Sequence, residues 1–305
     1  MNGFTKVYHK KSYDRIDPTV QASSQLGRTV LITGGSEGIG YGIAQGFARA
    51  KASRIILVAR NETKLDAASA QLKSGFQSTE VLTRVCDCSD VGQLEALFAH
   101  LNSEAIFVDV LILNAGATSN TTTAAEVAAV FHFNVISKIH LLELFQNQKS
   151  PNGGSSPRKI AIEISSASVH CYGGYPRTAY PSSKAGFANY LCHMAEHVPE
   201  TELRLISLHP GAIFTAASAA ASPMGADSPF WDHVDLPSHV AVWLASEESA
   251  FLHGRYIWAN WDVGELVALK EKIIDDKSLL KVGIIGVPSF TLQDLIKSAT
   301  PPAKD

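Results

Sequence analysis

The sequence has few charged residues, since Asp, Glu, Lys and Arg make up only 18% of its 305 residues and the formal net charge is -3. No run of basic residues is longer than Lys10-Lys11. Proteins that bind nucleic acid or anionic membranes through charge carry a basic patch, so we expect neither partner. The low charge and 46% hydrophobic content also exclude a disordered chain and predict a large buried core.

Long apolar runs and an N-terminal leader are also missing. No stretch reaches the roughly 18 uninterrupted apolar residues of a membrane-spanning helix. Lys6, Lys10 and Arg15 interrupt any apolar run at the N-terminus, which excludes a secretory signal. We therefore expect a soluble cytoplasmic protein that does not use a membrane.

Cysteine is scarce, and neither C-x2-C nor H-E-x-x-H occurs. The four cysteines are Cys86, Cys88, Cys171 and Cys192. A metal site needs Cys or His partners at ligand spacing, so we expect no metal and interpret the cysteines as ordinary thiols. Cys86 and Cys88 alternate at an expected strand end, which predicts side chains on opposite faces. We interpret His233 and His239, which also have no ligand partners at that spacing, as surface or helix-entry residues.

From Gly27 onward, short apolar strands alternate with helical segments. Strands are expected at residues 29–33, 54–59, 79–86, 107–113, 159–165, 203–208 and 255–259, and helices at 38–50, 61–73, 90–102, 123–147, 180–198 and 237–246. Apolar strands separated by helices predict a parallel sheet covered on both faces. We expect one α/β domain, a Rossmann-type doubly wound seven-stranded sheet over 27–262, with an N-terminal extension (1–26) and a C-terminal helix and tail (263–305).

A glycine-rich turn follows the first expected strand and reads Thr33-Gly34-Gly35-Ser36-Glu37-Gly38-Ile39-Gly40. Glycines at positions 34, 38 and 40 allow a tight turn, close approach of the backbone to a pyrophosphate and packing of the helix on the strand. The next helix offers free N–H groups and a partial positive charge at its N-terminus. The position of this turn between strand and helix indicates a dinucleotide site.

The end of the second expected strand indicates which dinucleotide binds. It reads Val58-Ala59-Arg60-Asn61, with no carboxylate before Glu62. An acidic residue there would bind a free ribose 2′-hydroxyl, whereas a basic one pairs with a 2′-phosphate. Arg60 therefore favours NADP(H). The alternative is that Arg60 is only a solvated residue at a helix start, and Glu37 in the loop is mildly against a 2′-phosphate.

Tyr180 is the only tyrosine with a lysine four residues later, Lys184. Four residues make about one helical turn, so the phenol and the ammonium share one helix face. A nearby positive charge stabilises a phenolate, and a phenol with an ordinary pKa of about 10 then becomes a useful proton donor near neutral pH.

Together, the Thr33-Gly34-x-x-x-Gly38-x-Gly40 and Tyr180-x-x-x-Lys184 motifs resemble those of the short-chain dehydrogenase/reductase family, and the resemblance covers roughly residues 27–262. Further matches follow in the family's order: Asp87, where the family contacts adenine; Asn114-Ala115-Gly116, which flanks the cofactor; Asn134 in the long helix; Ser165-Ser166; and His209-Pro210-Gly211-Ala212-Ile213-Phe214-Thr215, which is similar to a P-G-x-x-x-T segment beside the nicotinamide.

The resemblance implies a role for each catalytic residue. Tyr180 donates a proton to the carbonyl oxygen, and Lys184 lowers the pKa of Tyr180 and binds ribose hydroxyls. A serine polarises the substrate oxygen, and Asn134 holds the water that resupplies the proton. The residues expected to bind the cofactor are Gly34, Ser36, Gly38, Ile39, Gly40, Arg60, Asp87, Asn114, Gly116, Tyr180, Lys184, Pro210, Gly211, Ile213 and Thr215.

The position of the catalytic serine departs from the family pattern. The family's serine stands 13 residues before its tyrosine, a position that is Ala167 here. Ser166 stands 14 residues and Ser168 12 residues before Tyr180. We favour Ser166, because it ends the expected strand and the loop that follows would tolerate a one-residue insertion. Ser168 is the alternative.

The end of the seventh strand reads Trp258-Ala259-Asn260-Trp261-Asp262, where many relatives carry Asp-Gly-Gly. With the N-terminal extension, this segment resembles a subgroup of filamentous fungi that often acts in secondary metabolism.

Residues 216–236 resemble the family's mobile lid over the substrate, and the alternative is an ordinary surface loop. The lid's apolar residues are Pro223, Met224, Pro229, Phe230 and Trp231, and further wall candidates are His170, Tyr172 and Tyr175. Exposed apolar side chains of this kind predict an apolar, aromatic or polyketide-like ketone as the small-molecule substrate.

The family often dimerises through the two long helices, here 123–147 and 180–198, so the resemblance implies a homodimer or homotetramer. Apolar residues on these helices serve either the core or the interface: Phe131, Phe133, Phe187 and Leu191.

We expect an NADPH-dependent carbonyl reductase. One alternative is an NAD-dependent alcohol dehydrogenase working in the oxidative direction. Another is a non-catalytic dinucleotide-binding regulator, against which the set of Ser166, Tyr180, Lys184 and Asn134 argues, because a sensor needs no proton relay.

Overall fold

A computed structural model describes residues 4–119, 123–149, 158–172, 178–220 and 222–284. Seven parallel strands form one sheet in the order β3-β2-β1-β4-β5-β6-β7. The strands are β1 (Thr29–Thr33), β2 (Arg54–Ala59), β3 (Glu80–Val85), β4 (Val110–Leu113), β5 (Lys159–Ile164), β6 (Leu203–His209) and β7 (Arg255–Trp258). This confirms the expected doubly wound single domain. The strand order reverses between β1 and β4, where such sheets open a ligand crevice at the carboxyl ends of the strands.

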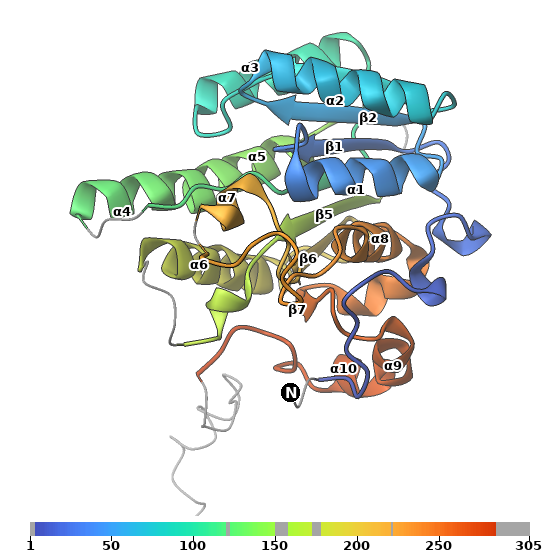
Figure 1. Cartoon of the computed structure of the whole chain (residues 1–305), viewed down its shortest axis with the longest axis vertical. Coiled ribbons are helices and arrows are strands. Elements are labelled where there is room, and N and C mark those ends of the chain that lie inside the picture. Colours follow the sequence, from blue (N-terminus) through green and yellow to red (C-terminus); the bar gives the residue numbers. More distant parts are fainter. Residues whose placement is uncertain (1–3, 120–122, 150–157, 173–177, 221, 285–305) are drawn as a thin grey trace, which may run out of the picture.

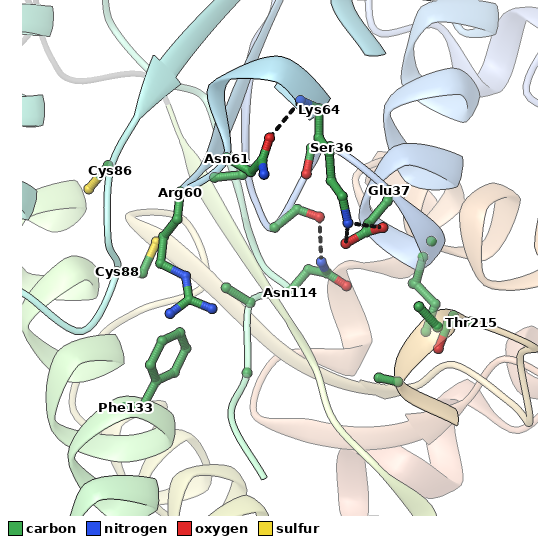
Figure 2. A pocket seen from close by; sticks show the side chains of 18 of the residues that line it. Ser36, Glu37, Arg60, Asn61, Lys64, Cys86, Cys88, Asn114, Phe133 and Thr215 are labelled. Carbon is green, nitrogen blue, oxygen red and sulfur yellow. Dashed lines mark hydrogen bonds and ion pairs between the residues drawn. The ribbon is translucent and has the colours of Figure 1, made fainter. Parts of the chain in front are cut away.

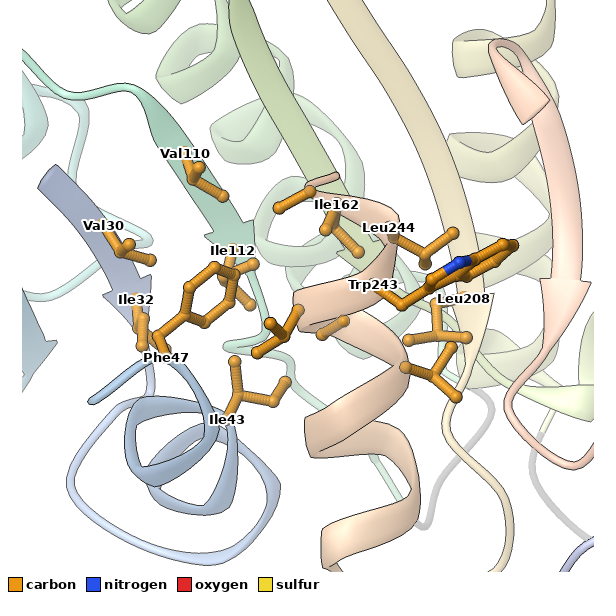
Figure 3. Packing of buried hydrophobic residues seen from close by; sticks show 14 of the residues in the cluster. Val30, Ile32, Ile43, Phe47, Val110, Ile112, Ile162, Leu208, Trp243 and Leu244 are labelled. Atoms are coloured by element: carbon orange, nitrogen blue, oxygen red, sulfur yellow. The ribbon is translucent and has the colours of Figure 1, made fainter. Parts of the chain in front are cut away.

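Helices cover both faces of the sheet (Figure 1). One face packs against α1 (Gly38–Arg49), α2 (Glu62–Gly75) and α8 (Asp235–Leu244), and the other against α3 (Val91–Ser103), α5 (Ser137–Gln146) and α6 (Ala179–Met194). Figure 3 shows Phe47 of α1 and Trp243 of α8 on the first face, against strand residues such as Ile112. Each such side chain contributes roughly 1.5–3 kcal/mol on burial.

The expected helix at 123–147 is one continuous helix, Ala124–Gln146, with a π-helical segment inside it. It comprises α4 (Ala124–Phe131), η3 (His132–Ile136) and α5. With a mean hydropathy of 1.3, it is the one helix among the described residues that is long and apolar enough to cross a membrane. A core helix of a soluble protein meets the same criteria, and this one packs against α3 and α6. Its π-helical segment carries Asn134, and such segments are frequent at functional sites.

The N-terminal extension is tied to the end of β7 and to the segment before α8. His9 N donates to Asn260 O (2.8 Å), and Asn260 Nδ2 donates to His9 O (2.9 Å). The next residue, Lys10, accepts from His233 N through its carbonyl (2.8 Å). The extension is therefore fastened by specific backbone pairing at the carboxyl-end edge of the sheet.

The expected C-terminal helix is two short helices, α9 (Val263–Ala268) and α10 (Lys270–Asp275), separated at Leu269. The remaining short elements are η1 (Asp14–Ile16), η2 (Gln21–Ser23), η4 (Ala167–Val169), α7 (Ala216–Ala219) and η5 (Glu247–Leu252). Of these, η4 and α7 flank the crevice at the carboxyl ends of β5 and β6.

Candidate active site

A cavity of about 650 Å³ lies at the carboxyl ends of β1, β2 and β4, where the strand order reverses (Figure 2). Of the expected cofactor residues, Gly34, Ser36, Gly38, Ile39, Arg60, Asn114, Gly116 and Thr215 line it. Gly40, Asp87, Pro210, Gly211, Ile213, Tyr180 and Lys184 are not among the residues that line this cavity. The lining of this cavity fits the phosphate and adenosine part of a dinucleotide.

The glycine loop needs its glycines for backbone reasons. Gly34 and Gly38 have φ of 64° and 58°, values that side chains with a Cβ rarely adopt. A Cβ on Gly40 would lie 2.3 Å from Gly34 O, so the helix and the loop approach more closely than any other residue allows. Glu37, the N-cap of α1, makes no side-chain cap hydrogen bond. This cradle fits a pyrophosphate, which the N-terminal amides of α1 would hold.

Asn114 ties the glycine loop to the end of β4. Its Nδ2 donates to Thr33 O (2.9 Å) and to Gly34 O (3.1 Å). In return, Thr33 Oγ1 accepts from the backbone N–H groups of Asn114 and Ala115, both at 3.1 Å. The side chain of Asn114 thus fixes the shape of the phosphate loop.

Two cations line the cavity at the adenosine end, and Figure 2 shows Lys64 beside Glu37 and Arg60 on the side of Phe133. Arg60 is 72% exposed, and its Nη1 lies 3.8 Å from Asp87 Oδ2. Lys64 Nζ lies 2.9 Å from both carboxylate oxygens of Glu37. The Glu37 charge that seemed unfavourable for a 2′-phosphate is therefore compensated by a lysine.

Asp87 lies at the outer edge of this region. Burial raises its pKa, but hydrogen bonds from Ser89 and the charge of Arg60 outweigh burial and bring the pKa below its ordinary value.

The expected divergence of Cys86 and Cys88 is wrong, because both line the cavity. Residues two positions apart along an extended chain point to the same face, so the alternating pattern itself places both cysteines on one side.

Tyr180 and Lys184 lie one turn apart on α6, with Lys184 Nζ 5.9 Å from the centre of the Tyr180 ring. Lys184 is buried, and its Nζ donates to Glu163 Oε1 (3.0 Å) and Ile164 O (2.5 Å). Burial alone would lower the pKa of Lys184, but Glu163 outweighs burial and the pKa is raised. Lys184 is therefore an ammonium at neutral pH, able to stabilise a phenolate.

Asn134 connects the segment after β4 to α6. Its Nδ2 donates to Ala117 O (2.8 Å) and to Ser183 Oγ (2.9 Å), and its Oδ1 accepts from Ala117 N (2.8 Å). A Cβ on Gly116 would lie 3.4 Å from Asn134 Oδ1 and 3.9 Å from Lys184 Nζ. The structure thus brings Asn134, Gly116 and Lys184 together.

The two candidate serines share one hydrogen bond. Ser168 Oγ donates to Ser166 Oγ (2.9 Å), and Ser166 is the N-cap of η4. Ser166 is half-buried, whereas Ser168 is buried. Ser166 is therefore the more exposed of the two residues, and its assignment as the catalytic serine stays a prediction.

His209 fixes the turn that carries these serines. Its Nδ1 accepts from Ala167 N (3.0 Å), and its ring meets Trp258 edge-on at 4.5 Å. Burial lowers the pKa of His209 to about 3. The ring is therefore neutral, with its proton on Nε2, and remains a hydrogen-bond acceptor for η4.

The segment after β6 is fixed by Asp232, a buried carboxylate. Gly211 has φ of 88°, and Asp232 Oδ2 accepts from Ala212 N (2.8 Å) and Asn260 Nδ2 (3.0 Å). Pro210 and Ile213 are buried. Thr215 faces Gly38, since a Cβ there would lie 3.3 Å from Thr215 Cγ2. The segment thus closes the cavity opposite the glycine loop.

The wall candidates are in part described. Trp258 Nε1 donates to His170 Nε2 (3.0 Å), and burial lowers the pKa of His170. Phe230 meets Trp231 edge-on at 5.0 Å, and Phe214 meets Trp231 at 5.4 Å. Tyr175 lies outside the described residues. No group of three or more His, Cys, Asp or Glu residues that could hold a metal occurs among the described residues.

Residues 28–225 match the family model for short chain dehydrogenases. The chain belongs to the short-chain dehydrogenase/reductase family. It is 36% identical over 286 residues to "Short chain dehydrogenase/reductase AacuD" of Aspergillus aculeatus, covering 92% of this chain and 96% of that protein. It is 38% identical over 288 residues to a "Short chain dehydrogenase/reductase" of Claviceps purpurea, covering 92% and 94%.

Solved structures with lower sequence identity share the fold. The Pseudomonas aeruginosa RhlG/NADP complex superposes with a TM-score of 0.69 at 23% identity, covering 78% of this chain and 97% of that chain. L-sorbose reductase from Gluconobacter frateurii, in complex with NADPH and L-sorbose, gives a TM-score of 0.68 at 24% identity, with the same coverage.

Several residues of this short-chain dehydrogenase/reductase site were not expected from the sequence. They are Lys64, Lys138, Glu163 and Asp232, together with the supporting role of His209. Lys64 stands at the third position of α2, three residues after its N-cap Asn61, where a side chain reaches back toward the strand end. The position of Lys64 could therefore have been used to predict a second cation at this end of the site. Lys138, Glu163 and Asp232 gave none, because their partners come from distant elements.

Lys138 yields a stability prediction. Burial and the neighbouring Lys184 lower its pKa from 10.5 to about 7. Between these values the unfolded chain binds one more proton than the folded chain, so stability rises with pH across that window. Below about pH 7 the full cost of the buried charge remains. Lys138→Met should therefore be more stable than the wild type at pH 7, by about 1–4 kcal/mol.

Denaturant unfolding at pH 7 and pH 9 checks this prediction. The advantage of Lys138→Met should be about 2 kcal/mol or more smaller at pH 9, where the wild-type lysine is already neutral in the fold. A variant that is less stable than the wild type at pH 7, with the same pH dependence, would contradict it.

Proposed function

We propose that this protein reduces a ketone or other carbonyl on an apolar, aromatic or polyketide-like small molecule, with NADPH as reductant. The observation that carries the proposal is Tyr180 one turn from a buried Lys184 whose charge is secured by Glu163. A phenol beside a permanent ammonium is suited to donate a proton to a carbonyl oxygen.

The choice of NADPH is supported by the charges at the adenosine end of the cavity. Arg60 and Lys64 both line it, and the nearby carboxylates of Asp87 and Glu37 already face these cations. A free carboxylate that would select the ribose 2′-hydroxyl is not among the cavity's described lining residues. The related structures of RhlG and L-sorbose reductase contain NADP or NADPH.

NADPH, when bound, supplies the hydride. The chain's own residues supply binding and proton chemistry. The α1 amides bind the pyrophosphate, and Arg60 and Lys64 bind the 2′-phosphate. Tyr180 protonates the substrate oxygen, and Ser166 hydrogen-bonds the same oxygen. Lys184 holds the phenolate that remains, and Asn134 keeps α6 in register with the segment after β4.

An apolar substrate is supported by the side chains around the expected lid. Phe214, Met224 and Phe230 are 39%, 41% and 50% exposed, which is unusual for apolar residues that gather over one site. The Phe214-Trp231-Phe230 contacts form an aromatic group beside α7. The relatives from Aspergillus aculeatus and Claviceps purpurea are fungal proteins, and a role in fungal secondary metabolism is part of this proposal.

We further propose a homodimer or homotetramer built on the long helix Ala124–Gln146 and on α6. Phe187 and Leu191 belong to the core, whereas Ile136 is 53% exposed on the helix that contains α4. Sedimentation equilibrium at micromolar concentration should give two or four subunits. A monomer across that range would contradict this proposal. The expected cytoplasmic location and the lack of nucleic-acid and membrane partners remain predictions.

The function is tested by following NADPH absorbance with a panel of aromatic ketones and quinones. At least one member should be consumed with NADPH in a stoichiometric, enzyme-dependent reaction. The matched control is the same panel with NADH, for which turnover should be at least tenfold lower. Equal or faster turnover with NADH would contradict the cofactor assignment.

A further inference from the structure

Lys184 of the Tyr180-Lys184 pair belongs to a buried cluster of three charged side chains, with Glu163 and Lys138 as the other two members. Glu163 on β5 is fully buried, and its Oε1 lies 3.0 Å from Lys184 Nζ and 3.5 Å from Lys138 Nζ. Lys138 comes from α5, and its Nζ also donates to Leu113 O (3.3 Å). Two lysines from two helices thus share one carboxylate oxygen.

The strand register explains why Glu163 points toward α5 and α6. On β5, Ile160, Ile162 and Ile164 pack on the side of α1 and α8, and Ala161 packs on the opposite side. Glu163 has the parity of Ala161 and therefore faces the helices that carry Lys138 and Lys184. It occupies a position where a parallel strand covered on both faces normally carries an apolar residue.

Burying these three charged groups lowers the stability of the folded state. Replacing buried ionic groups by apolar side chains is often neutral or stabilising, so such clusters need another reason to exist. Among the described residues, Glu163 Oε2 has no hydrogen-bond partner, which adds the cost of a desolvated acceptor. The two lysines also repel each other when both are protonated. A costly cluster in contact with the catalytic lysine points to function.

The shared oxygen makes the two lysines competitors. When Lys138 is neutral, the Glu163 carboxylate pairs with the Lys184 ammonium alone. The same ammonium also donates a hydrogen bond to Ile164 O. When Lys138 is protonated, it draws on the same Oε1 and repels the Lys184 ammonium. Burial and Lys184 lower the pKa of Lys138 to about 7, so both states are populated near neutral pH.

We propose that Glu163 and Lys138 are positioning residues that hold the Lys184 ammonium and set the charge around it, so that the proton chemistry of Tyr180 follows the protonation of Lys138. The other titratable groups that interact with the cluster are Tyr180 on α6, Tyr256 on β7 and Cys88 after β3. Lys138 Nζ also lies over the Phe187 ring, 5.4 Å from its centre.

The first test needs no substrate or cofactor. Lysine labelled with 13C at Cε reports the protonation of each amine by NMR. We expect one signal, missing from Lys138→Met, to titrate near pH 7, and a second, missing from Lys184→Met, to shift with the same midpoint. Glu163→Gln should move the Lys138 midpoint to lower pH, because the ammonium loses its counter-charge. If the Lys138 signal does not titrate between pH 6 and pH 8, the proposal is overturned.

The second test rests on the proposed function and uses a ketone that the panel identifies. Between pH 8 and pH 6, wild-type kcat/KM should fall at least threefold further than that of Lys138→Met, since protonated Lys138 competes for Glu163. Lys159→Met is the matched control: Lys159 lies on the same strand with the same parity and donates to Gln146 O, away from Lys184. It should keep the wild-type profile.

The outcomes separate the two claims. A Lys138→Met profile identical to the wild type shows that the lysine is only structural and overturns the proposal. If no ketone is reduced at all, the proposed function fails. The labelled-lysine titration alone then tests whether the protonation of Lys138 affects Lys184.

Discussion

Tyr180→Phe should lower the turnover of a responsive ketone by on the order of 10³-fold, because general acid catalysis typically contributes 10²–10⁴-fold. The variant removes one hydroxyl and leaves the aromatic ring, so α6 and the contact between Lys184 and the ring remain. NADPH affinity, measured by fluorescence titration, should change little. Steady-state assays with the same ketone check the loss.

Tyr190→Phe is the matched control for Tyr180→Phe. Tyr190 lies on the same helix, and its ring stacks on Phe187 at 6.2 Å, away from the cavity. It loses the same atom from the same kind of residue and should retain full activity. If Tyr180→Phe turned over the ketone as fast as Tyr190→Phe, Tyr180 would not be the proton donor.

Arg60→Asp should reverse the cofactor preference. It removes a cation that faces the cavity and introduces a carboxylate where one would bind a free ribose 2′-hydroxyl. A hydrogen bond to a charged group contributes about 1.5–3 kcal/mol, so NADPH should bind about 10- to 100-fold more weakly. NADH should bind as well as before or better. Fluorescence titration of both cofactors measures the change.

Arg49→Asp serves as the control for Arg60→Asp. Arg49 lies in the last turn of α1, is 41% exposed and does not line the cavity, so it changes the net charge equally without touching the cofactor. Its NADPH affinity should match the wild type. If Arg60→Asp kept the wild-type preference for NADPH, the 2′-phosphate would not depend on Arg60.

The strands were predictable because most of them are short, largely apolar runs between helical segments. The largest error is at β4, which begins at Val110 rather than at residue 107. The ends of helices were harder to place. Nothing in the apolar pattern of residues 123–147 indicates the π-helical turn that carries Asn134. The partners of the Asn134 side chain, Ala117 O and Ser183 Oγ, come from other parts of the chain.

The site was predictable where it depends on local spacing. The glycine loop and the Tyr180-Lys184 pair are local patterns: the loop lies between β1 and α1, and the pair lies one turn apart on α6. The cluster beneath them was not predictable. Lys159 and Glu163 share a parity on β5, and charges with period two normally indicate a solvated strand face. Only the fold shows that α5 and α6 bury that face and provide the partner lysines.

In the proposed reaction, hydride is delivered to a carbonyl carbon and a proton comes from Tyr180. The most direct test is to reduce a responsive ketone with NADPH that carries deuterium at the transferred position. Mass spectrometry then measures the deuterium content of the product alcohol. We expect one deuterium per product alcohol with the wild type, and no product above background with Tyr180→Phe. A product alcohol without deuterium, or equal yield from Tyr180→Phe, would contradict the claim.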